Sequence, residues 1–234
     1  MSAIFRREFK AFFTSPVGFV VVAIVFLFTG FFFTTFNIYN LSPDLSYVFS
    51  SLFPVTLIIL PLLTMRLFSD EKRMKTDQVL LTSPVSIGGI ILGKFFAAFL
   101  AFALSLILMI VFAMIIAFQV TPDWAVIIGN YLGILLVGGL VISIGLLISS
   151  VTESQLIAAI GTLAISFILL LVDGLAAMLN VPFLITIVDF LSVSQRYSSF
   201  TSGLIAYDDI IFFLSMQALF LFLTARVLDK KRWS

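Results

Sequence analysis

The chain has 234 residues, 62% of them hydrophobic and 11% charged, with a net charge of +1. Soluble domains carry about 25% charged residues, so this composition places the chain in a lipid bilayer and excludes a large soluble domain beside the membrane part. Cysteine and histidine are absent, which excludes disulfides, thiol nucleophiles and imidazole relays and removes the usual ligands of a metal site. The balanced charge offers no sign of a nucleic-acid partner, and we expect none.

The first element predicted is a short amphipathic helix over residues 3–14. Its apolar residues fall on one arc at helical spacing, and its basic residues fall on the other. This pattern is typical of an interfacial helix that lies on the cytoplasmic leaflet in contact with membrane lipid, and Pro16 ends it. Glu8 falls inside the apolar arc, where it either contacts a partner protein or a loop, or pairs with a Lys or Arg of its own chain. The apolar arc consists of Ile4, Phe5, Phe9, Phe12 and Phe13.

Six further segments are long and apolar enough to cross a bilayer as helices, which needs roughly 20 residues each. The sequence therefore predicts one all-α, polytopic membrane domain over residues 1–234, with both termini on the same side. The expected spans are Val17–Phe36, Leu52–Phe68, Phe95–Phe118, Ala125–Ile148, Leu156–Leu179 and Ile210–Leu228.

The basic residues indicate which side is cytoplasmic. Six spans place 12 of the 13 Lys and Arg residues on the side of the termini, and only Arg196 falls on the other side. Positive charge accumulates on the cytoplasmic side of membrane proteins, so both termini are expected in the cytoplasm.

The segment Arg66–Lys94 is the long polar stretch between the second and third spans, and it holds eight charged residues. Arg66 to Lys75 are expected to extend the second span, after which Thr76 caps a second short helix with Asp77 in its first turn. Val79, Leu80 and Leu81 make part of that helix apolar. Such a helix suits the groove of a soluble partner; a solvated or membrane-lying loop is the alternative.

One motif in this stretch imitates a nucleotide-binding loop. Gly88, Gly93 and Lys94 satisfy most of the P-loop pattern, but Phe95 stands where the pattern requires Ser or Thr. No hydroxyl is available there for magnesium, and a membrane span follows. If ATP is used, another polypeptide binds it.

The other loops offer weaker signals. Ser149–Ser154 is a short turn that either presents Glu153 to a partner or only connects two helices. The loop over residues 180–209 contains Val181–Leu191, which is apolar but too short to span and suits a re-entrant or interfacial helix. A Ser-rich run then joins the two halves. This loop is expected to be a gate, a contact for an outer partner or a structural plug, with local pairing among Asp189, Arg196, Asp208 and Asp209.

At this point the chain resembles an ABC-2-type permease, the membrane subunit of an ATP-binding-cassette transporter. It is most similar to the branch of the gliding-motility permease and the permease of nitrous-oxide-reductase maturation. The resemblance rests on the string MRLFSDEKRMKTDQVLLTSPVS followed by LGK, and on REFKAFFTSPVGFV, SSVTESQLIAAI and SFTSGLIAYDDIIFFLS.

The resemblance implies roles for three parts of the chain. Residues 69–94 would form the cytoplasmic coupling loop, whose helix docks on the ATPase subunit; Gln78 departs from the family pattern, in which glutamate is common. Residues 1–15 would be the interfacial connecting helix, with Phe5, Glu8, Phe9 and Phe12. Thr152 and Glu153 would form a second coupling element. The docking residues implied are Asp70, Glu71, Arg73, Thr76, Gln78, Val79, Leu80 and Leu81.

The resemblance also implies an assembly in a bacterial inner membrane. Two permease subunits, identical or different, would join two ATPase subunits that bind ATP and magnesium, so this chain itself would hold no cofactor and catalyse no reaction. Export-type transport is the leading hypothesis. A membrane anchor or mechanical transmitter driven by the same ATPase is the alternative. An ion-coupled carrier is disfavoured because Asp173 is the one carboxylate within the expected spans.

Overall fold

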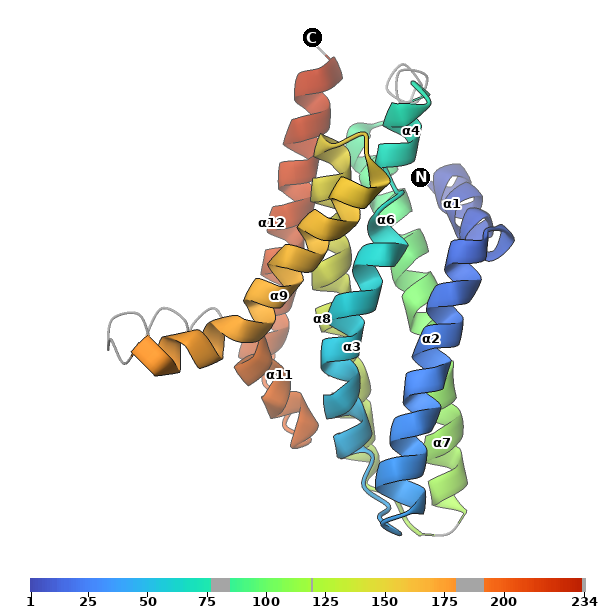
Figure 1. Cartoon of the computed structure of the whole chain (residues 1–234), viewed down its shortest axis with the longest axis vertical. Coiled ribbons are helices and arrows are strands. Elements are labelled where there is room, and N and C mark those ends of the chain that lie inside the picture. Colours follow the sequence, from blue (N-terminus) through green and yellow to red (C-terminus); the bar gives the residue numbers. More distant parts are fainter. Residues whose placement is uncertain (77–84, 119, 180–191, 233–234) are drawn as a thin grey trace.

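The computed structural model describes residues 1–76, 85–118, 120–179 and 192–232, and within them the regular elements are helices. Figure 1 shows an elongated bundle with both chain ends at the same end, here called the terminal end. The helices are α1 (Ser2–Thr14), α2 (Pro16–Phe33) continued by the π-helix η1 (Thr34–Ile38), α3 (Ser46–Thr64), α4 (Ser69–Arg73), α6 (Ile87–Ser105), α7 (Ile107–Ala117), α8 (Trp124–Val151), α9 (Gln155–Leu179), α11 (Val193–Thr201) and α12 (Tyr207–Arg232).

The all-α fold with six spans is confirmed for the described residues, six of whose helical segments are long and apolar enough to cross a membrane. The start of the third span differs from the prediction, and this difference changes the position of Gly93 and Lys94. The third span begins at Ile87 rather than Phe95, because the Ser86 hydroxyl accepts a hydrogen bond from the Gly89 amide and caps the helix. Gly93 and Lys94, expected in a loop, are therefore helical residues inside the bundle.

Helix α8 is the centre of the bundle and packs against α3, α6, α9, α11 and α12. Its small residues allow this close packing: a Cβ atom at Gly138 would lie 2.1 Å from the ring of Phe102, and one at Gly145 would lie 2.1 Å from the Thr64 hydroxyl. At these two positions the glycines therefore serve packing between helices of the same chain.

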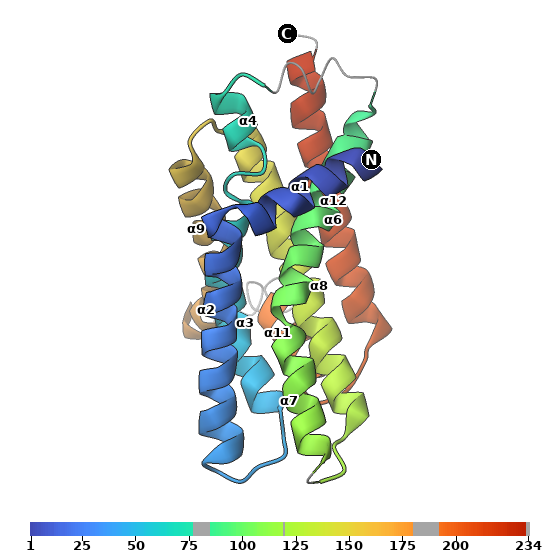
Figure 2. The same ribbon diagram turned by 90° about the vertical axis from the view of Figure 1, so that its right-hand side faces the viewer.

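Helix α1 covers nearly the residues predicted for the N-terminal helix, whose interfacial character stays a prediction. Figure 2 shows it crossing over α6 near the terminal end. Ile4 and Phe12 are buried, and Phe5 and Phe9 are half-buried against the core. A Cβ atom at Gly93 would lie 3.2 Å from the Ile4 side chain, so the missing side chain of Gly93 allows α1 to lie close to α6. The apolar arc thus packs against protein, while its position on a leaflet stays a prediction.

The Ser-rich run after residue 191, expected to be a connector, is instead the helix α11. Val193, Tyr197 and Phe200 lie on one face of α11 and are buried, and the Tyr197 hydroxyl donates a hydrogen bond to the Phe49 carbonyl at 3.0 Å. The predicted local pairing in this loop is confirmed by an ion pair of 2.8 Å between Arg196 and Asp209. Val181–Leu191, Asp189 and the side chain of Asp173 lie outside the described residues, so the re-entrant helix stays a prediction.

Candidate functional site

Helix α4 is a single short element at the terminal end, and its charges suit its own dipole. Asp70 and Glu71 lie in its first turn, and Lys72 and Arg73 lie in its last. Negative charge near a helix N-terminus and positive charge near its C-terminus are both favourable. The surrounding contacts show that these side chains also join other parts of the chain.

The first set of contacts connects α4 to α1 and α6 through Lys94. The Lys94 side chain is 1% exposed, and its Nζ lies 3.0 Å from Oε1 of Glu8 and 3.0 Å from Oε1 of Glu71. It also donates a hydrogen bond of 2.6 Å to the Leu67 carbonyl and lies 5.0 Å from the centre of the Phe68 ring. A buried ammonium is costly unless it is paired and hydrogen-bonded, and both conditions are met here.

Arg7 completes this cluster on its solvent side. Its guanidinium lies 2.5 Å from Oε1 of Glu8 and also donates a hydrogen bond to Glu71, while its own side chain is 53% exposed. Two cations and two carboxylates thus balance each other. We call Arg7, Glu8, Glu71 and Lys94 the four-residue cluster.

The environment of Glu8 favours its charged form. Burial by itself would raise the pKa of Glu8, but the charge of Lys94 and hydrogen bonds from Arg7 and Lys94 lower it below the ordinary value. The pKa of Arg7 is raised by both carboxylates, although burial opposes this effect. Both shifts favour the charged forms of Glu8 and Arg7 at neutral pH.

The second set of contacts connects α4 to the turn between α8 and α9. Lys72 donates a hydrogen bond to the Ser150 carbonyl, and Gln155 donates one to the Asp70 carboxylate. Beside these contacts is a hollow of about 470 Å³. It borders the two loops that the sequence predicts to be cytoplasmic, residues 69–94 and Ser149–Ser154. It is lined by Arg73, Glu153, Ser154, Gln155 and Leu156.

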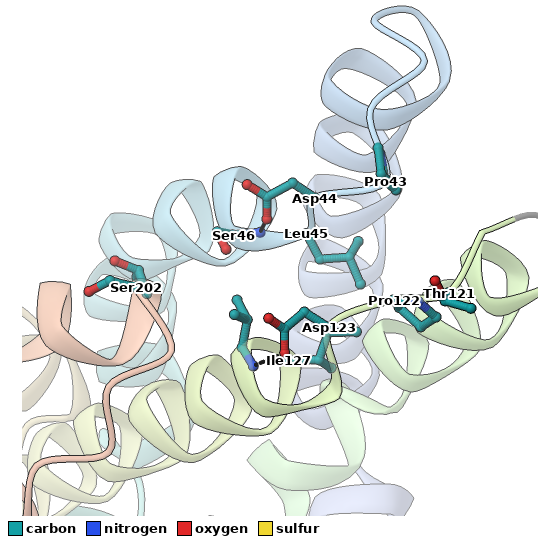
Figure 3. A pocket seen from close by; sticks show the side chains of 11 residues that line it. Pro43, Asp44, Leu45, Ser46, Thr121, Pro122, Asp123, Ile127 and Ser202 are labelled. Carbon is teal, nitrogen blue, oxygen red and sulfur yellow. Dashed lines mark hydrogen bonds between the residues drawn. The ribbon is translucent and has the colours of Figure 1, made fainter.

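A different hollow, also of about 470 Å³, lies at the opposite end of the bundle, and the sequence did not indicate it. Figure 3 shows Asp44 and Asp123, which border this hollow from the loops directly before α3 and α8. Both carboxylates are already engaged in their own turns: Asp44 accepts a hydrogen bond from the Ser46 amide at 2.9 Å, and Asp123 accepts one from the Ala125 amide at 3.1 Å. These acids therefore act as helix-start residues.

A comparison with known protein families covers the region that contains α4 and its contacts. A model of the ABC-2 family transporter proteins matches residues 48–233, more than three quarters of the chain. The chain belongs to the ABC-2 transporter family. The matched region begins within α3 and contains α4, Lys94 and the α8–α9 turn, whereas α1 precedes it. A search of curated proteins gave no match for this ABC-2 protein.

The residues predicted for docking fall into three groups in this ABC-2 protein. Asp70, Glu71 and Arg73 lie together on α4, and the Thr76 hydroxyl donates a hydrogen bond to the Glu71 carbonyl just beyond it. Thr152 and Glu153 lie in the turn that α4 contacts. The remaining predicted docking residues lie outside the described part of the chain and stay predictions: Gln78, Val79, Leu80 and Leu81.

Of the predicted interfacial residues, Glu8 has a defined partner. Two interpretations were open for it, a contact with a partner protein or loop, or a pair within its own chain. The structure shows that Glu8 pairs with Arg7 and Lys94 of its own chain. The same two cations also pair with Glu71 of the predicted coupling loop. Sequence reasoning did not identify Lys94 or Gln155 as partners. The signal for Lys94 was a lone cation directly before an apolar run, which marks a charge at the end of a span.

Proposed function

We propose that this ABC-2 protein is the permease subunit of an ATP-driven transporter, and that a separate ATPase subunit docks on α4 and the adjoining loop. The observation that carries the proposal is the position of α4 among four other elements. Through the contacts of Glu71, Lys72 and Asp70 it joins α1, α6, α8 and α9. A displacement of this one short helix would therefore be transmitted to helices from both halves of the chain.

The same proposal assigns the terminal end to the cytoplasm, in agreement with the distribution of Lys and Arg. The ATPase would bind ATP and magnesium, and this chain would hold no cofactor. Two copies, or this chain and a related permease, would form the membrane part, with an outer accessory protein as a possible partner at the opposite end. We place the protein in a bacterial inner membrane, in the gliding-motility and nitrous-oxide-maturation branch, with export as the direction of transport.

The hollow beside α4 supports docking at this place. Arg73 and Glu153 border it with opposite charges, and the second coupling element predicted from sequence forms its other wall. A partner helix or loop that enters it would touch both cytoplasmic loops at once. This geometry also explains how the short turn at Thr152 and Glu153 would take part in docking.

Co-purification of the full chain with its ATPase tests the proposal. Leu80→Asp with Leu81→Asp should abolish recovery of a partner that has a complete P-loop, while the chain still inserts in the membrane. The matched control is Tyr39→Asp with Leu41→Asp, two exposed residues at the opposite end, which should leave recovery unchanged. Undiminished recovery with the first pair would contradict the docking assignment.

A further inference from the structure

The outward side of α1 carries two cations that have no counter-charge in the described part of the chain. Arg6 and Lys10 are exposed and four positions apart, so they are neighbours on one face of the helix. Neither side chain forms an ion pair with a described residue, whereas Arg7 is engaged with Glu8 and Glu71. Helix α1 therefore presents two adjacent positive charges that are not neutralised.

Contacts on the other side of α1 fix its rotation about its own axis. The buried face is centred on Glu8, whose carboxylate pairs with the buried ammonium of Lys94. An α-helix turns by about 100° per residue, so Arg6 and Lys10, each two positions from Glu8, lie about 200° around the helix from it. Both cations consequently point away from the bundle.

A stripe of aromatic rings lies between the buried face and the two cations. Phe5, Phe9 and Phe13 follow one another at one-turn spacing, with ring centroids 5.8 Å and 5.1 Å apart, and all three are only half-buried. On the other side of the helix, Arg7 contacts Glu71 of α4, and Figures 1 and 2 both show α4 nearer the terminal end than α1. Phe9 is two positions from Arg7 and lies about 200° around the helix from it. The aromatic stripe therefore faces away from the terminal end, toward the spans.

The position of α1 in the chain places it where a bilayer begins. Its last residue, Thr14, stands two positions before Pro16, the first residue of the first span. A helix that precedes a span directly and turns an aromatic stripe toward it lies along the boundary between hydrocarbon and headgroups, with its cations among the headgroups. Zwitterionic headgroups have no net charge to neutralise Arg6 and Lys10, whereas anionic headgroups do.

We propose that the outward face of α1 binds anionic phospholipid, of which phosphatidylglycerol is the simplest example. The lipid phosphate accepts hydrogen bonds from Arg6 and Lys10, and the acyl chains pack beneath the aromatic stripe. The stripe favours lipid over an acidic segment of a soluble protein, because such a segment would leave the half-exposed rings uncovered. The proposal goes beyond the docking of an ATPase and does not depend on it, since it needs only this chain and lipid.

Native mass spectrometry of the full chain, purified in detergent without a partner, tests this assignment. Phosphatidylglycerol and phosphatidylcholine with identical acyl chains are added separately. Each cation contributes about fivefold to the affinity for an anionic lipid surface, so phosphatidylglycerol should be retained about thirtyfold more strongly than phosphatidylcholine. Inorganic phosphate at the same concentration should not displace the lipid, because it makes no contact with the rings. Equal retention of the two lipids, or displacement by phosphate, would overturn the proposal.

A matched pair of double variants locates the site. Arg6→Gln with Lys10→Gln should lower the retention of phosphatidylglycerol about thirtyfold, to that of phosphatidylcholine. The control is Arg226→Gln with Lys230→Gln, which removes two exposed cations at the same spacing from α12, at the same end of the bundle, and should leave retention nearly unchanged. All four side chains are exposed, so both variants should fold. An equal loss in the two variants would show attraction to positive charge in general, and full retention by the first would place the lipid elsewhere; either result would reject the site.

Discussion

The Lys94 ammonium lies 3.0 Å from the Glu8 carboxylate, although 86 positions separate the two residues in the chain. This pair joins an N-terminal helix that precedes the family match to a helix inside it. A buried ion pair adds little net stability compared with apolar residues of the same size, but breaking one is costly. The four-residue cluster therefore holds α1, α4 and α6 in one relative arrangement, as the proposed docking of an ATPase on α4 would require.

Lys94→Met should destabilise the protein by about 3 kcal/mol, because it leaves Glu8 and Glu71 beside each other without their buried cation. The expected result is a lower unfolding temperature in detergent, followed by tryptophan fluorescence. Lys10→Met, which removes an exposed cation of α1, should change stability by no more than about 0.5 kcal/mol. Adding Glu8→Gln and Glu71→Gln to Lys94→Met should restore part of the loss. If the triple variant is no better than the single one, the carboxylates are not the cause.

The contribution of Glu8 should depend on pH with a defined sign. Its pKa is lower in the folded protein than its ordinary value of 4.5, so its stabilising effect is present above that value and is lost as the pH falls through the folded-state pKa. The difference in unfolding temperature between the natural protein and Glu8→Gln should be constant near neutral pH and shrink in acid, below about pH 4.5. A difference that persists unchanged in strong acid would contradict this account.

The α3–α8 contact predicts opposite effects for two glycines. Gly145→Ala should destabilise the protein by about 1–3 kcal/mol, since the new methyl group would overlap the Thr64 side chain. Gly30→Ala is the matched change in another span, where a Cβ meets nothing within 4 Å. It should be neutral or stabilise by up to about 1 kcal/mol, through helix propensity. Thermal unfolding of both variants measures the contrast, and equal effects would show that α8 does not lie this close to α3.

The orientation in the membrane can be tested with a single thiol, because the natural chain has no cysteine. Asn40→Cys, at the end opposite the termini, should react with a membrane-impermeant maleimide in intact cells. An epitope tag added after Ser234 should be reached by antibody only after the cells are permeabilised. Detection of the C-terminal tag in intact cells would reverse the assignment of the terminal end to the cytoplasm.

The amino-acid sequence alone determined the features that depend on local composition and period. Apolar runs of sufficient length predicted the six spans, and the alternation of Phe and basic residues predicted α1 with nearly its observed limits. These features could be predicted because a helix in a bilayer satisfies its own backbone hydrogen bonds, so length and hydrophobicity are enough. The helical nature of the Ser-rich run was missed because its apolar stripe, Val193, Tyr197 and Phe200, is short.

Only the tertiary structure decided which distant residues share a site. The sequence identified Glu8 as anomalous and Glu71 as a docking residue, but nothing local connected either of them to Lys94, or Asp70 to Gln155. It also placed Lys94 in a loop, because a lone cation beside an apolar run resembles a boundary; the Ser86 cap and the pairing with two carboxylates bring it into the helix. Helical periodicity specifies which face of a helix is apolar, whereas ion pairs between helices depend on their crossing and rotation, which long-range packing sets.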